Sequence, residues 1–155
     1  MSMEPLPPSL LELNAYLLSK IGKGARRAAA ERLATRRLRL WHMAVLATLD
    51  DFGPQIQRDL ATRLGIDPSD VVKVLDELAS ANLIERTRDP ADRRRVLTAV
   101  TGPGRALLAE LHADEKAADD ELLAPLDDAE RAHLHDLLLR VHTHAHAHSA
   151  GGNAV

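Results

Sequence analysis

The sequence predicts a mainly α-helical chain with one small β wing. Three observations support this fold class: apolar side chains recur at helical spacing along most of the 155 residues, two short helical segments flank a glycine in the middle of the chain, and two short strand-like runs follow on either side of a charged turn. Two close helices followed by a charged hairpin are typical of a winged helix-turn-helix.

The N-terminal part is expected to be an extended arm followed by one long helix. Residues 1–8 contain three prolines and read as the arm. Ser9 and Glu12 form a capping-box pattern that starts a helix at residue 9. Its apolar positions and helix-favouring residues continue to about residue 38, with a bend expected near the two glycines at positions 22 and 24.

The next three helices are predicted to be short. Residues 40–49 are strongly apolar, and a loop over residues 50–54 follows them. Apolar residues spaced four apart predict one amphipathic helix over residues 55–64, and Gly65 ends it. Asp67 and Pro68 then open a further helix as its N-cap and first residue. The apolar face of that helix has members at i, i+3, i+4 and i+7: Val71, Val74, Leu75 and Leu78.

The C-terminal third predicts a hairpin and two more helices. Strands are expected over residues 83–87 and 95–100, joined by a charged turn. A helix from residue 103 to about residue 123 follows, and Asp127 with Glu130 gives a second capping-box pattern before the last helix. The tail from Ser149 is small and polar, so we expect it to be flexible.

Composition limits the classes of partner. The net charge of −3 hides basic clusters before residue 40 and around the charged turn, which allow one face to meet phosphates. Only three aromatic residues occur, too few for the stacking platforms of single-strand binders, so a duplex is favoured. The absence of cysteine excludes disulfides and thiolate metal sites. With no membrane-spanning run and no secretion signal in the sequence, we expect a cytoplasmic protein that has no membrane partner.

Three segments closely resemble the MarR family of multiple-antibiotic-resistance regulators. These segments are LWHMAVLATL, QRDLATRLGIDPSDVVKVLDELASANLIERTRDPADRRR and VTGPGRALL, which together cover about residues 40–110. The resemblance implies a homodimer in which a winged helix-turn-helix lobe, residues 40–101, binds DNA. It implies a helical dimerisation region over residues 9–38 and 103–148, with flexible termini at residues 1–8 and 149–155. It also implies a small aromatic or phenolic ligand, bound between lobe and dimerisation region.

Base contacts are expected from the exposed face of the second helix of the helix-turn-helix, at Ser69, Asp70, Val72 and Lys73. Asp70 and Val72 depart from the family pattern, and the favoured interpretation of Asp70 is a carboxylate that stabilises the helix N-terminus without touching DNA. Phosphate contacts are expected from residues at the start of the preceding helix: Gln55, Gln57 and Arg58.

The charged turn is the sharpest local hypothesis. An arginine that enters a narrow minor groove meets a concentrated negative potential. The family pattern assigns this role to Arg94, with Asp92 orienting its guanidinium and with Arg93 and Arg95 facing phosphates or solvent. The alternative is a turn that charge merely keeps soluble.

Histidines are the remaining candidates for chemistry. His42, beside Trp41, falls where the family's ligand pocket would be, and a partly buried structural role is an equal alternative. The run HTHAHAH near the C-terminus suggests metal ligands, but alternate spacing does not bring all four to one helix face. We therefore assign no metal ligand and expect no cofactor. No phosphate loop, dinucleotide fingerprint, HExxH or nucleophile elbow occurs, so no enzyme is predicted.

These features together predict a sequence-specific regulator of transcription, a ligand-responsive repressor that acts as a homodimer on a pseudo-palindromic operator. One alternative is a metal-responsive regulator that uses the histidine-rich tail. Another is a winged helix that serves as a protein-interaction module and does not bind DNA, for which Asp70 and the net acidity are the best support. The arginine cluster of the turn argues against that second alternative.

Overall fold

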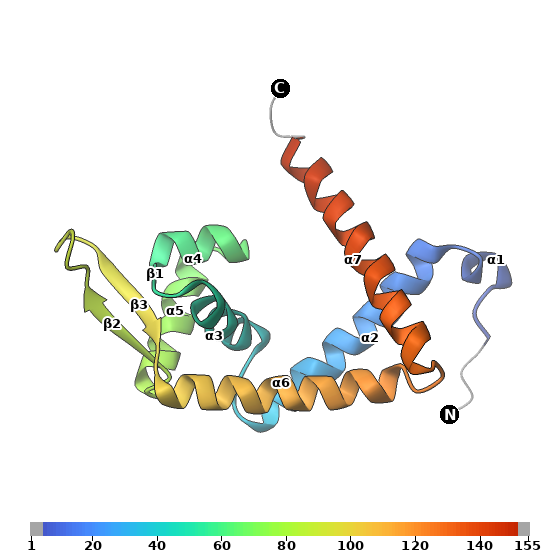
Figure 1. Ribbon diagram of the computed structural model, residues 1–155, viewed down its shortest axis with the longest axis horizontal. Helices are drawn as coiled ribbons and strands as arrows, with labels where there is room; N and C mark the ends of the chain where they lie inside the picture. The colour runs from blue at the N-terminus through green and yellow to red at the C-terminus, as the bar shows by residue number, and fades with distance from the viewer. Residues whose placement is uncertain (1–4, 152–155) are drawn as a thin grey trace. The chain divides into compact units, whose positions relative to one another are not determined.

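The computed structural model describes residues 5–151, with side chains to residue 147 (Figure 1). The parts of the predicted flexible termini at residues 1–4 and 152–155 lie outside this range. Two compact units, Met1–Ala113 and Asp114–Val155, are described separately below. The elements, in chain order, are α1 Pro8–Leu11, α2 Asn14–Thr35, α3 Leu40–Phe52, β1 Gln55–Ile56, α4 Gln57–Leu64, α5 Pro68–Ser80, β2 Ile84–Arg88, β3 Val96–Val100, α6 Gly102–Leu122 and α7 Asp128–Gly151.

The predicted fold class is confirmed, since the chain is mainly helical with a small antiparallel sheet. The sheet has three strands in the order β1-β3-β2. Strand β2 pairs with β3 from Ile84 opposite Val100 to Arg88 opposite Val96. This hairpin, which we call the wing (residues 84–100), extends beyond α3, α4 and α5 (Figure 1).

The N-terminal helix differs from the prediction, because two helices replace one. Helix α1 starts at Pro8. Proline is tolerated at the first helical position because the backbone N–H there has no hydrogen-bond partner within the helix. Ser9 therefore lies inside the helix and not at its cap. Leu13 has an extended backbone and separates α1 from α2. The glycines at positions 22 and 24 do not interrupt α2, because one glycine costs a helix only about 1 kcal/mol.

The helix-turn-helix forms as predicted. Gly65 adopts the left-handed conformation, with φ 63° and ψ 34°, and ends α4. Asp67 caps α5 by accepting a hydrogen bond from the Ser69 backbone N–H at 2.9 Å. The apolar stripe of α5 is fully buried, at 0–1% exposure: Val71, Val74, Leu75 and Leu78.

The first residues of the predicted 55–64 helix form a strand. Gln55 and Ile56 pair with Thr98 and Leu97 of β3, and α4 begins at Gln57. This pairing joins segments about forty residues apart, so local periodicity gives no sign of it.

Gly104 sets the start of α6 against the loop between α5 and β2. Thr101 donates its backbone N–H to the Leu83 carbonyl at 3.1 Å and its hydroxyl to the Asn82 carbonyl at 2.7 Å. The Leu83 carbonyl oxygen therefore lies very close to Gly104. A Cβ on residue 104 would collide with this oxygen and with the Val100 side chain. The close approach therefore requires glycine.

The second unit begins α7 with the predicted capping box. Asp127 and Glu130 exchange backbone-to-side-chain hydrogen bonds of 2.9 Å in both directions. Arg131 donates to the carbonyls of Leu123 and Leu126, which closes the turn between α6 and α7. Helix α7 continues to Gly151, past the Ser149 position where the sequence predicted a flexible tail. No helix within the described residues is long and apolar enough to cross a bilayer.

Replacing Gly104 with alanine should lower the free energy of unfolding by about 1–3 kcal/mol, because the new Cβ overlaps a backbone carbonyl that cannot move independently. Replacing Gly102, where a Cβ would meet nothing within 4 Å, is the matched control and should change stability by less than about 0.5 kcal/mol. Urea denaturation of the two variants gives the comparison. Equal stabilities would show that this contact does not constrain the fold.

Candidate nucleic-acid interface

Helix α5 presents a polar face opposite its buried stripe. Ser69, Asp70, Val72 and Lys73 are all exposed, as the sequence predicted for base-reading positions. Val72 is 42% exposed although it is apolar. An exposed aliphatic side chain between polar ones suits contact with a thymine methyl group in the major groove.

Ser69 is less free than the sequence suggested. Its hydroxyl donates to Asp67 Oδ1 at 2.5 Å, and its backbone N–H donates to the same oxygen at 2.9 Å. These two hydrogen bonds hold the pKa of the Asp67 carboxyl below its ordinary value, and the bond from the hydroxyl has the larger effect. With its proton directed to Asp67, the Ser69 hydroxyl presents acceptor lone pairs outward.

A salt bridge ties α5 to the wing. Arg86 of β2 donates to Asp76 Oδ1 at 2.8 Å. Both groups are substantially exposed, so the pair contributes little stability and chiefly fixes orientation. The exposed face of α5 and the wing are thus linked directly as well as through the core.

The turn of the wing has a defined conformation. Asp92 Oδ1 accepts from the backbone N–H of Arg94 at 3.1 Å and from its Nε at 3.3 Å. The Arg94 side chain is nevertheless 92% exposed. Arg88 donates to the carbonyl of Arg93 at 2.8 Å, and Arg95 lies 4.0 Å from Asp89. Asp92 therefore orients an arginine that projects into solvent, in the arrangement expected of a minor-groove contact.

The predicted phosphate contacts divide into two groups. Gln57 and Arg58 are exposed in the first turn of α4. Gln55 lies in β1, and its side-chain amide donates to the carbonyls of Phe52 and Gly53 at 3.4 Å. Its amide is thus engaged with the loop before β1, which leaves Gln57 and Arg58 as the better placed of the three.

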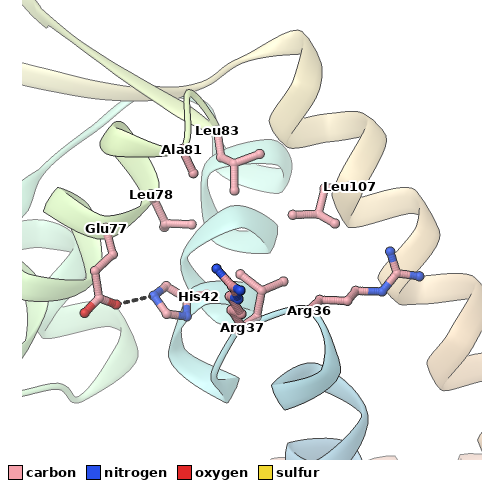
Figure 2. A pocket seen from close by; sticks show the side chains of 9 residues that line it. Arg36, Arg37, His42, Glu77, Leu78, Ala81, Leu83 and Leu107 are labelled. Carbon is pink, nitrogen blue, oxygen red and sulfur yellow. Dashed lines mark hydrogen bonds and ion pairs between the residues drawn. The ribbon is translucent and has the colours of Figure 1, made fainter.

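A separate cavity of about 390 Å³ lies in the first unit (Figure 2). Its cationic residues are Arg36 and Arg37, and the side chains of Leu38, Leu78, Leu83 and Leu107 supply apolar wall. Arg36 is paired with Glu110 at 2.6 Å. Arg37 has no ion pair or hydrogen bond from its side chain within the described part of the chain. A guanidinium without an ion pair beside an apolar wall suits an organic anion.

His42 lines this cavity and is 3% exposed. Its Nδ1 accepts the backbone N–H of Arg39 at 2.8 Å, so its proton lies on Nε2, which donates to Glu77 Oε2 at 2.6 Å (Figure 2). Arg39 also donates to this oxygen at 2.6 Å. The hydrogen bonds from Arg39 and then from His42 lower the pKa of the Glu77 carboxyl. Both ring nitrogens of His42 thus have partners within the protein, and the ring lies at the cavity wall.

Trp41, the other predicted ligand contact, is not among the cavity-lining residues and packs against the hydrophobic core. Sequence patterns did not identify Arg36, Arg37 and Glu77 as cavity residues. Arg37 has a positive φ of 58°, which glycine adopts at lower cost, yet an arginine occupies it. A charged run at the end of a helix is the only signal that sequence offered for these residues.

Comparison with known proteins gives one family. The model of the MarR family matches residues 40–96. A putative transcriptional regulatory protein for the hcr operon of Thauera aromatica is 38% identical over 86 residues, 56% of this chain and 52% of its own length. The HTH-type transcriptional repressor NicR of Pseudomonas putida is 27% identical over 96 residues, 62% of this chain. The chain spans about half to three-fifths of the length of these two curated relatives.

Solved structures match over more of the chain. A MarR-family transcriptional regulator from Rhodococcus sp. RHA1 is 31% identical, with a TM-score of 0.69 over 82% of this chain and 90% of its own. Wild-type MarR from E. coli gives a TM-score of 0.72 at 25% identity, over 90% of this chain and 98% of its own.

The wing geometry predicts an order of effects for three alanine variants. Replacing Arg94 should weaken duplex binding by tenfold or more, since a good groove contact is worth about 1–3 kcal/mol. Replacing Asp92 should weaken it less, because the arginine remains but loses its orienting partner. Replacing Arg95 is the matched control: it removes the same charge from the same turn and should cost little.

Equilibrium binding of these variants to one duplex at one salt concentration decides between geometry and simple charge. If the turn acted only through its positive charge, the Asp92 variant would bind the duplex more tightly than the wild type, because it lacks one negative charge. That result would contradict the assigned roles.

Proposed function

The chain belongs to the MarR family of winged helix-turn-helix transcriptional regulators, and from this membership we propose that it is a ligand-responsive repressor that binds a pseudo-palindromic DNA duplex as a homodimer. This family consists of regulators and not of enzymes. The observation that carries the proposal is the wing, where Asp92 orients an Arg94 side chain that projects into solvent from the same unit as the polar face of α5.

Duplex binding is supported by the position of these two surfaces. The N-terminal end of α5 would enter the major groove with Ser69, Asp70, Val72 and Lys73, and the wing would reach the adjacent minor groove. Gln57 and Arg58 would hold phosphates. The first turn of α5 adds its own partial positive charge, which Asp70 partly offsets.

Homodimer formation is supported by apolar side chains that a single copy leaves exposed. On α2, Leu18 and Ile21 are 46% and 54% exposed, and on α7, Leu139 and Val141 are 54% and 60% exposed. Each unit therefore carries a helix with exposed apolar side chains, which is typical of a region that meets a second copy. We assign the dimerisation region to the helices that precede and follow the lobe, as the sequence predicted.

A ligand role is supported by the cavity at Arg37. The solved PcaV regulator of Streptomyces coelicolor is in complex with its natural ligand, and DNA binding by BpsR of Bordetella bronchiseptica is regulated by 6-hydroxynicotinic acid. In this chain, the cavity is lined by the Arg37 guanidinium and by leucine side chains. Arg37 has no ion pair among the described residues. A small aromatic acid would satisfy both.

The proposed function predicts a dimer that selects duplex fragments from a pool of genomic DNA. Sedimentation at micromolar protein should give the dimer mass, and the selected sites should hold two half-sites about 10 base pairs apart. Affinity should fall steeply as salt rises, because binding releases counterions from the phosphates. A folded monomer, or a preference for single strands, would contradict the proposal.

Replacing Arg37 with glycine should abolish the response to an aromatic acid without harming the fold. Glycine relieves a left-handed backbone that costs other residues about 1–2 kcal/mol, so stability should stay constant or rise. Calorimetry with 4-hydroxybenzoate, and with uncharged phenol for comparison, measures ligand binding. Release of a bound duplex on addition of each compound measures the response. Asn82→Gly is the matched control, since Asn82 has the same φ of 58° and does not line the cavity. If the Arg37→Gly protein still responds to the acid, this cavity is not the ligand site.

A further inference from the structure

Helix α7 carries two exposed histidines one turn apart. The rings of His142 and His146 lie 4.1 Å apart between centroids, with their planes tilted by 33°. Sequence spacing alone could not bring all the C-terminal histidines to one face. The helix continues through this segment to Gly151, however, so residues four apart do share a face.

We propose that His142 and His146 form a binding site for one divalent transition-metal ion of the copper, nickel or zinc type. Neutral imidazole is a ligand that all three ions accept. Two histidines at i and i+4 of a helix are also the pair that holds zinc in helical metalloprotease motifs. Nitrogens that share one tetrahedral ion at about 2.0–2.1 Å lie roughly 3.3 Å apart, which rings in contact can reach by small side-chain rotations.

Both rings are available to an ion. Neither has a hydrogen bond or ion pair among the described residues, and both are exposed. The described positions three or four residues away along α7 hold Leu138, Leu139, Thr143 and Ala145, none of which is cationic. Arg140 is two positions from His142, a spacing that places it on the other side of the helix.

The site holds two protein ligands. No group of three metal-ligating side chains occurs within the part of the chain that the structure describes. His135 shares the stripe of His142, but seven residues of helix separate them by about 10 Å along the axis. Water would complete the coordination, so binding should be moderate in strength and tightest for Cu²⁺, the divalent ion that nitrogen sites bind most strongly. Mg²⁺ and Ca²⁺, which take oxygen ligands, should not bind here.

The test uses the full-length chain without an affinity tag and three double variants. His142→Ala with His146→Ala removes the proposed ligands. His133→Ala with His135→Ala removes two imidazoles whose spacing of two residues points them apart. His144→Ala with His148→Ala removes the other two histidines that share a four-residue spacing in the sequence. Calorimetry with Cu²⁺, with Mg²⁺ as a reference, gives affinity, and electron paramagnetic resonance reports the number of bound imidazole nitrogens.

We expect the His142/His146 variant to bind Cu²⁺ at least about tenfold more weakly, since even an outer partner of a metal ligand is worth about 10–100-fold. Its spectrum should lose the signature of two nitrogens, while the other two variants keep both affinity and spectrum. Circular dichroism should show all variants equally helical, because alanine favours a helix. Unchanged Cu²⁺ affinity in the His142/His146 variant, or an equal loss in either other variant, would overturn the proposal.

Discussion

The lobe depends on the burial of one apolar stripe, formed by Val71, Val74, Leu75 and Leu78 of α5. Full burial of a valine or leucine is worth about 1.5–3 kcal/mol, so rotating α5 about its axis would expose side chains that together dominate its stability. The Asp67 cap fixes where the helix starts, and the Gly104 contact holds the start of α6 against Leu83, in the loop that follows α5. The polar face of α5 is outward as a consequence of these constraints.

The opposite end of the same helix reaches the cavity. At the cavity wall, Glu77 accepts hydrogen bonds from Arg39 and His42. Ser69 and Lys73 lie on the side of the helix that we propose faces DNA. A helix held by its buried stripe moves as a unit, so a change in the surroundings of Glu77 would shift the residues that we propose to read bases. In the proposed function, occupancy of the cavity acts on DNA binding through α5.

Features that depend on near neighbours could be predicted from the sequence. The Gly65 turn, the Asp67 cap, the stripe of α5 and the Asp127 capping box all join residues within a few positions of one another. The pairing of Asp92 with Arg94 is instead expected from the resemblance to the MarR family. Features that join distant segments could not be predicted this way. The pairing of β1 with β3 and the cavity built from Arg37, His42, Glu77 and Leu107 depend on tertiary packing. The left-handed backbone of Arg37 is likewise a product of the folded turn.

The central claim is that the N-terminal end of α5 and the turn of the wing together contact duplex DNA. Hydrogen–deuterium exchange of the protein with and without a selected duplex tests this directly, because bound backbone segments exchange more slowly. The account predicts slower exchange over residues 67–73 and 88–96. Slower exchange confined to other segments, with both of these unchanged, would contradict it.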